Sequence, residues 1–256
     1  MELTKFYKYQ TSQEAVSAYL LRLLRYLGIK EGGLEHNEIV KAYNTLQGRP
    51  EGLPRGIKAV MDYDWCAIFA AGQAHAMGLT DAYPMEMSCS KIIEIAKDMG
   101  IWIEDDSYIP VPGDWCIFAW KGQEGQENTL APNHIGAVYF SDGEIFLTVE
   151  GNKGDTVGTR ALQVGDKRIR GFVHPDFSVC IGKSIAPGEP VTQPVEPVQP
   201  IYRRLEEVPE WGKATVAKLH QRKLLLGVGE DDLALSEDLV RTLTVLDRAN
   251  AFDLAF

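Results

Sequence analysis

The chain has 256 residues, of which 45% are hydrophobic and 24% are charged, as is typical of a soluble globular protein. Its 26 basic and 36 acidic residues give a net charge of −10, which argues against nucleic-acid binding because phosphate neutralisation needs an excess of Lys and Arg. The same charge opposes simple adsorption to anionic lipids or wall polymers, so binding to an acidic surface would have to be specific.

The sequence has no apolar run of about 18 residues, so we expect no membrane span. The N-terminus lacks the apolar segment of a secretory signal, and we expect a protein made in the cytoplasm, with its four cysteines as free thiols. No Cys-x-x-Cys pair is present, and residues 28–38 lack the alternating ligands of a calcium loop. We therefore predict neither a metal nor a cofactor.

The first half of the chain is predicted to be helical. Ser12 is the expected N-cap of a helix over 13–27, and Asp64 is the expected N-cap of a second helix that runs to Gly78. A third helix is predicted over 90–99. Each of these segments is followed by a glycine, which commonly terminates helices.

Strands follow the turn Pro112-Gly113-Asp114. Short runs rich in aromatic and β-branched residues predict four of them, over 115–120, 135–140, 145–149 and 169–174. Helices followed by a run of antiparallel strands indicate an α+β domain, which we place at 1–182.

The segment 183–202 contains a proline at every third or fourth position in PGEPVTQPVEPVQP. This spacing favours extended polyproline II, and we interpret the segment as a semi-rigid linker rather than an ordered loop. Residues 203–256 then form a small helical module, with one helix from Trp211 to Leu226 and a second capped by Ser236. So small a core suggests that the module needs a partner or a docking surface.

Cys66 is the first candidate for chemistry. With Asp64 as the cap, Trp65 and Cys66 lie in the first turn of a helix, where the amide groups and the helix dipole stabilise a thiolate. A thiolate is the nucleophile of cysteine hydrolases. The alternative is an inert buried cysteine on an apolar helix face, which is common when no histidine is nearby.

His134 and Glu150 supply the missing partners. A three-residue loop, Ser141-Asp142-Gly143, pairs His134 directly with Glu150 across two strands, whereas a two-residue loop would turn Glu150 to the other face. We favour the three-residue loop because it leaves one face wholly apolar. A carboxylate beside an imidazole orients the ring and stabilises its charged form. The alternative is a surface ion pair of little consequence.

Other residues have supporting roles in this prediction. Asn152 lies two residues after Glu150, so it is a second candidate to orient His134 or to polarise a substrate carbonyl. Tyr63 and Trp65 either line the substrate groove or pack in the core. The remaining histidines are assigned no catalytic role: His36 and His220 are expected to be solvated, and His174 to be structural. Cys89, Cys116 and Cys180 are assigned no partner that would activate them.

Taken together, these motifs resemble the CHAP family of cysteine, histidine-dependent amidohydrolases/peptidases, within the papain-like, NlpC-related peptidoglycan hydrolases. The shared features over 60–175 are Trp65-Cys66-Ala67, Pro112-Gly113-Asp114, His134-Ile135-Gly136 and Val149-Glu150-Gly151-Asn152. The resemblance implies a papain-like fold with Cys66 as nucleophile, His134 as base and Glu150 as the residue that orients it. Asn152 and Asp64 are then supporting residues.

The resemblance also implies a phage-type lysin that cuts amide bonds of bacterial peptidoglycan, as an amidase or an endopeptidase, after release from the cytoplasm. Residues 203–256 look like a single degenerate S-layer-homology motif, which predicts binding to a secondary cell-wall polymer or self-association into a homo-oligomer. Two alternatives remain: a thiol protease or amidase with a protein substrate, and a catalytically silent wall-binding or virion protein.

Overall fold

The computed structural model describes residues 8–49, 51–120, 131–183 and 201–221, together with residues 225, 233, 235–236, 240 and 243–244. The chain divides into two compact units, Met1–Gly188 and Glu189–Phe256. Residues 184–200 of the predicted linker and most of the second predicted C-terminal helix lie outside the described residues. Within the described part of the chain, no helix is long and apolar enough to cross a membrane.

The first unit begins with helices. They are α1 (Ser12–Leu24), α2 (Leu34–Asn44), α3 (Cys66–Ala76) and α4 (Cys89–Asp98), with 3-10 turns at Thr45–Gly48, Pro54–Gly56 and Phe177–Cys180. Helix α2 was not predicted. The N-cap of α1 is Thr11 rather than Ser12, because the Thr11 hydroxyl accepts a hydrogen bond from the amide of Glu14 at 3.1 Å.

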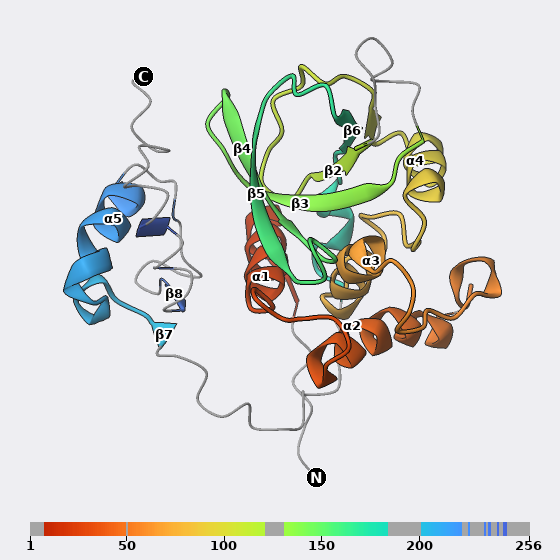
Figure 1. Cartoon of the computed structure of the whole chain (residues 1–256), viewed down its shortest axis with the longest axis horizontal. Helices are drawn as coiled ribbons and strands as arrows, with labels where there is room; N and C mark the ends of the chain where they lie inside the picture. The colour runs from red at the N-terminus through yellow and green to blue at the C-terminus, as the bar shows by residue number, and fades with distance from the viewer. Residues whose placement is uncertain are drawn as a thin grey trace. The chain divides into compact units, whose positions relative to one another are not determined.

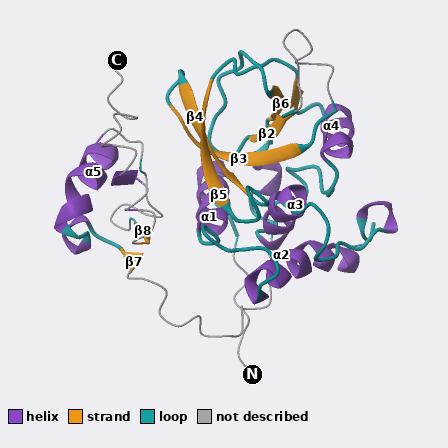
Figure 2. Ribbon diagram, viewed as in Figure 1, coloured by secondary structure: helices purple, strands orange, loops and turns teal. Residues whose placement is uncertain are grey.

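A six-stranded antiparallel sheet follows, in the order β1-β6-β2-β3-β4-β5. Its strands are β1 (Trp102–Ile103), β2 (Trp115–Phe118), β3 (His134–Ser141), β4 (Ile145–Glu150), β5 (Gly158–Gln163) and β6 (Ile169–Val173). Strands β1 and β5 were not predicted, but the α+β class is confirmed (Figure 2).

The sheet has an apolar cluster on each face. Alternate residues such as Ile117, Ile135 and Val149 join the large core formed with α1 to α4, whereas Phe118, Val138 and Phe146 belong to a second cluster. This alternation follows from the two-residue period of a strand. Helix α3 packs against β3, where Figure 1 shows the two elements side by side.

Helix α3 is the central helix of this unit. Every residue from Cys66 to Ala74 is buried, as expected for a helix that is apolar on all sides. It lies close to α2, because a Cβ atom at Gly72 would be only 2.9 Å from the backbone nitrogen of Tyr43. Packing on several sides therefore fixes the position of the first residue of α3, Cys66.

The second unit contains α5 (Glu210–Gln221), a 3-10 turn at Leu205–Glu207, and a two-stranded sheet of β7 (Ile201–Tyr202) and β8 (Leu235–Ser236). The predicted linker is therefore too long at its C-terminal end, because residues 201–202 pair with β8. Helix α5 buries Gly212, Val216 and Leu219 and leaves Trp211 38% exposed.

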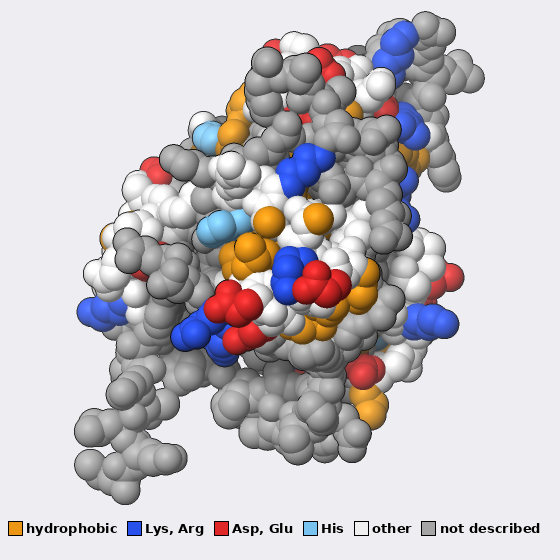
Figure 3. Space-filling model, turned by 90° about the vertical axis from the view of Figure 1, so that its left-hand side faces the viewer, with side chains coloured by type: hydrophobic (Ala, Val, Ile, Leu, Met, Phe, Trp, Pro, Cys, Tyr) orange, Lys and Arg blue, Asp and Glu red, His pale blue; other side chains and the backbone are white. Residues whose placement is uncertain are grey.

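Figure 3 shows one face of the molecule, on which Lys and Arg side chains lie beside Asp and Glu side chains. The described residues therefore give this face charges of both signs.

Candidate active site

Cys66 occupies the first position of α3, where its side chain is 5% exposed. The helix begins one residue later than predicted from the Asp64 cap: its N-cap is Trp65, and no side chain caps it. The amide of Ala67 donates a hydrogen bond to Cys66 Sγ. Cys66 thus lies where unpaired amides and the helix dipole favour a negative charge.

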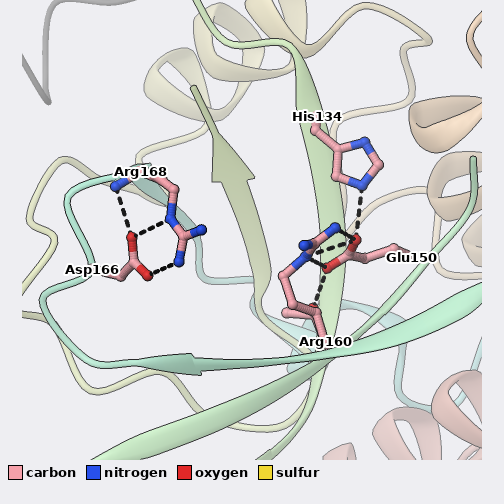
Figure 4. A network of polar contacts seen from close by, with 6 residues as sticks. His134, Glu150, Arg160, Asp166 and Arg168 are labelled. Atoms are coloured by element: carbon pink, nitrogen blue, oxygen red, sulfur yellow. Dashed lines mark hydrogen bonds and ion pairs between the residues drawn. The ribbon is translucent and has the colours of Figure 1, made fainter. Parts of the chain in front are cut away.

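His134 and Glu150 are in contact. His134 Nε2 lies 3.0 Å from Glu150 Oε2, and both residues are buried, with 8% and 0% of their surface exposed (Figure 4). His134 also hydrogen-bonds with the Cys66 thiol. Because Nε2 is bonded to Glu150, Nδ1 is the ring nitrogen that remains for the interaction with Cys66. The three predicted residues therefore form a continuous chain from Cys66 through His134 to Glu150.

The register that creates this contact differs from the prediction. Val149 pairs with Ala137 and Thr148 with Val138, so Glu150 lies opposite Gly136 and not opposite His134. The turn is centred on Gly143 and Glu144, where the Asp142 amide bonds to the carbonyl of Ile145. A bulge at Tyr139 adds one further residue to β3. A count of loop residues could not reveal this bulge.

Glu150 reaches His134 diagonally across Gly136. A Cβ atom at Gly136 would lie 2.7 Å from Glu150 Cγ and 2.9 Å from Thr148 Cβ, which is too close for any side chain. The next glycine is equally constrained, because a Cβ at Gly151 would lie 2.6 Å from Phe69 Cβ on α3. The glycines of His134-Ile135-Gly136 and Glu150-Gly151 thus let the carboxylate pass over β3 and let α3 approach β4.

Arg160 on β5 is a site residue that the sequence did not reveal. Its Nε and terminal nitrogen bond to the two oxygens of Glu150 at 2.8 and 2.9 Å, and Thr148 Oγ1 donates to Glu150 at 2.6 Å (Figure 4). The segment 158–163, GTRALQ, has no strong apolar alternation, so neither β5 nor Arg160 was recognised. The contact with Glu150 depends on that strand pairing.

These contacts keep Glu150 ionised despite its burial. Burial raises its pKa, but the hydrogen bonds from His134 and Arg160 outweigh this effect, and the net shift is downward. A carboxylate held as an anion stabilises the charged imidazole beside it. Figure 4 shows that Arg168 instead pairs with Asp166, apart from this group.

The interaction between Cys66 and His134 lowers the pKa of the thiol and raises the pKa of the imidazole. A hydrogen bond from Cys89 and the contact with His134 outweigh burial and lower the pKa of Cys66 to about 5. Burial lowers the pKa of His134, but its bonds to Cys66 and Glu150 prevail and raise it to about 9. Near neutral pH the two residues therefore form a thiolate–imidazolium pair, the reactive state of a cysteine hydrolase.

Cys89 also belongs to the site, although the sequence analysis assigned it no partner. It is the first residue of α4 and is 8% exposed, and its thiol hydrogen-bonds with that of Cys66. This bond, together with burial, raises the pKa of Cys89 well above its ordinary value. Cys89 thus remains a protonated donor while Cys66 is a thiolate.

The predicted supporting residues differ in their surroundings. Asn152 Nδ2 donates to Asp64 Oδ1 at 3.3 Å, so these two residues pair with each other. Trp65 is fully buried, with its indole N–H donating to Glu31 at 3.0 Å, and therefore cannot line a groove. Tyr63 is 44% exposed and keeps that role open.

An aromatic cluster lies beside His134. The Trp120 ring is 6.0 Å from the His134 ring and stacks on Phe118 at 4.6 Å, measured between centroids. The guanidinium of Arg160 lies 4.4 Å from the Trp120 centroid, a cation–π contact. Arg160 is thereby held from two sides, by Glu150 and by Trp120.

Two further histidines of the first unit, His36 and His174, have partners other than Cys66 and Glu150. His36 is fully buried against the Trp65 ring, which corrects the expectation that it is solvated. His174 Nδ1 lies 2.8 Å from Asp114, whose carboxylate also accepts bonds from Tyr108 and the amide of Val111, so it is structural as expected. Within the described residues, no three His, Cys, Asp or Glu side chains form a group that could hold a metal ion.

Comparison with known proteins identifies no relative: no family model, no curated protein and no solved structure matches the chain. The features that bear on function are the geometry of Cys66, His134 and Glu150 and the residue pattern around them.

Proposed function

We propose that this protein is a papain-like thiol hydrolase that cuts amide bonds of bacterial peptidoglycan. The observation that carries the proposal is the chain of contacts from Cys66, at the start of α3, through His134 to the buried carboxylate of Glu150. Nucleophile, base and orienting group each have the partner that their role requires. An inert buried cysteine would need neither the imidazole nor the carboxylate.

The first half of the reaction is acylation. The Cys66 thiolate attacks the amide carbonyl carbon, and the backbone amide of Cys66 at the helix start donates to the oxygen that becomes negative. The His134 imidazolium gives its Nδ1 proton to the nitrogen of the leaving amine. The C–N bond breaks and a thioester on Cys66 remains, with His134 now neutral.

The second half is deacylation. Neutral His134 removes a proton from a water molecule, which attacks the thioester carbon and releases a carboxylic acid and the Cys66 thiolate. Glu150 remains an anion throughout, because Arg160 and Thr148 saturate its oxygens. Its role is to hold the imidazole ring and to stabilise its charged form.

The choice of peptidoglycan as substrate comes from the residue pattern that this site shares with CHAP hydrolases. Two of its glycines have a structural reason, since Glu150 passes over Gly136 and Phe69 packs on Gly151. The close contacts at Gly136 and Gly151 support the interpretation that the motifs around Cys66, His134 and Glu150 belong to one active site. In this proposal residues 203–256 bind a wall polymer or a second copy of the chain.

Loss of turbidity of purified cell walls tests the proposal. The wild-type protein is expected to clear the suspension, and Cys66→Ala is expected to leave it unchanged at equal protein concentration. Cys180→Ala is the matched control, because Cys180 lies in the 3-10 turn Phe177–Cys180 and not in the contact chain. Lysis by Cys66→Ala, or new N-termini in a protein substrate beside intact walls, would contradict the proposal.

A further inference from the structure

Cys66 and Cys89 form a thiol pair within this site. They are the first residues of α3 and α4, both are buried in the same core cluster, and the side chain of each shifts the pKa of the other. Cys116, in β2, belongs to the apolar cluster on the other face of the sheet, and Cys180 lies in the turn Phe177–Cys180. The thiolate mechanism requires only Cys66, so its contact with a second thiol is unexplained by catalysis.

The two thiols differ in ionisation in the way that peroxide chemistry requires. Cys66 is the thiolate, which peroxides oxidise, and Cys89 is the protonated neighbour. The negative charge of Cys66 is one cause of the raised pKa of Cys89. Oxidation of Cys66 to a neutral sulfenic acid removes that charge, and the Cys89 proton becomes easier to lose.

We propose that Cys66 and Cys89 are a peroxide-modification site, in which Cys89 converts oxidised Cys66 into a reversible intramolecular disulfide. In the first step the Cys66 thiolate attacks one oxygen of hydrogen peroxide, the O–O bond breaks, and the leaving hydroxide takes a proton from the His134 imidazolium to become water. Sulfur is oxidised and peroxide is reduced. Cys66 becomes a sulfenic acid and His134 becomes neutral.

In the second step Cys89 resolves the sulfenic acid. Neutral His134 accepts the Cys89 proton, the resulting thiolate attacks Cys66 Sγ, and the S–O bond breaks as the hydroxide leaves. His134 returns the proton to that hydroxide, which becomes water. The sulfurs move from hydrogen-bonding contact to about 2.05 Å. Catalysis stops, because the nucleophile is bonded, but a dithiol reductant restores both thiols.

The test uses the full-length reduced protein and hydrogen peroxide, with an acid quench. The number of free thiols, titrated in denaturant, is expected to fall from four to two, and the intact mass to decrease by two hydrogens. Peptide mapping is expected to show the Cys66 and Cys89 peptides joined. Treatment with dithiothreitol should restore four free thiols. Because these readouts need no substrate, they remain valid if the proposed hydrolysis is wrong.

Two variants complete the test. In Cys89→Ser, a near-isosteric change, Cys66 is expected to gain two oxygens as sulfinic acid, which dithiothreitol does not reverse. Cys180→Ser is the matched control and should still form the Cys66–Cys89 disulfide. The proposal is overturned if wild-type Cys66 accumulates as sulfinic acid, joins a different cysteine, or survives peroxide as a free thiol.

Discussion

Glu150 extends across the bare backbone of Gly136 to reach His134. The Cβ atom of any other residue at position 136 would lie 2.7 Å from Glu150 Cγ, so the carboxylate would have to move. The contact between His134 and Glu150 therefore depends on a residue that has no side chain of its own.

Gly136→Ala is expected to displace Glu150, to abolish most wall lysis and to cost about 1–3 kcal/mol of unfolding free energy, as overpacking does. Denaturant unfolding and the lysis rate measure these effects. Gly48→Ala is the matched control, because nothing lies within 4 Å of a Cβ there, and its cost should remain below about 0.5 kcal/mol. Equal stability and activity of the two variants would contradict the role of Gly136.

Arg160→Met removes the bidentate partner of Glu150. The pKa of Glu150 should rise because it loses the hydrogen bonds from Arg160, so Glu150 becomes protonated at a higher pH and the acid limb of the activity profile should move to higher pH. The expected loss of stability is below about 3 kcal/mol, because the Arg160 side chain is 28% exposed. A pH–rate profile and denaturant unfolding measure these effects.

Arg168→Met is the control for Arg160, since Arg168 also lies over the Trp120 ring but pairs with Asp166 and is 52% exposed. Its loss of stability should be below about 1 kcal/mol, with no change in the acid limb of the activity profile. Identical pH profiles for the two variants would show that Arg160 does not act through Glu150.

The ionisation of Cys66 and His134 predicts the pH range of the reactive pair. The pKa of Cys66 is lowered to about 5, so the thiolate is lost only as the pH falls through that value. The pKa of His134 is raised to about 9, so the imidazolium is lost as the pH rises through that value. Alkylation of Cys66 by iodoacetamide, followed by peptide mass, should remain fast down to about pH 5. If the alkylation rate of Cys66 reached half its maximum only at about pH 8.5, the pKa of an ordinary thiol, that result would contradict the ion pair.

The residues before α1 and α3 offer a further comparison. Thr11→Ala should cost about 1 kcal/mol, because the Thr11 hydroxyl caps α1. Asp64→Ala should cost less than about 0.5 kcal/mol, because Asp64 does not cap α3 and only accepts a bond from Asn152. Thermal unfolding measures both. A larger cost for Asp64→Ala would restore Asp64 as the stabilising residue at the start of α3.

The sequence was most informative where residue type and local position suffice. The α+β class follows from the order of the helical and strand patterns, and Cys66 begins a helix whichever neighbour caps it. His134 and Glu150 end up in contact even though the predicted register is wrong, because long side chains on neighbouring strands also meet diagonally.

What could not be predicted depends on pairing between distant segments. Arg160 reaches Glu150 only because β5 joins β4, and its strand has no strong apolar alternation. Cys89 interacts with Cys66 only through the packing of α4 in the same core as α3, about which their separate patterns carry no information. The bulge at Tyr139 is likewise invisible to a period-two pattern.

The most direct test of the central claim is mass spectrometry of the fragments released from purified peptidoglycan by the wild-type protein and by Cys66→Ala. We predict that the wild-type protein releases fragments whose new ends are an amine and a carboxylic acid, at a single type of amide bond, and that Cys66→Ala releases none. The same fragments from Cys66→Ala, or new ends that lie in the sugar chain, would contradict thiol-dependent amide hydrolysis.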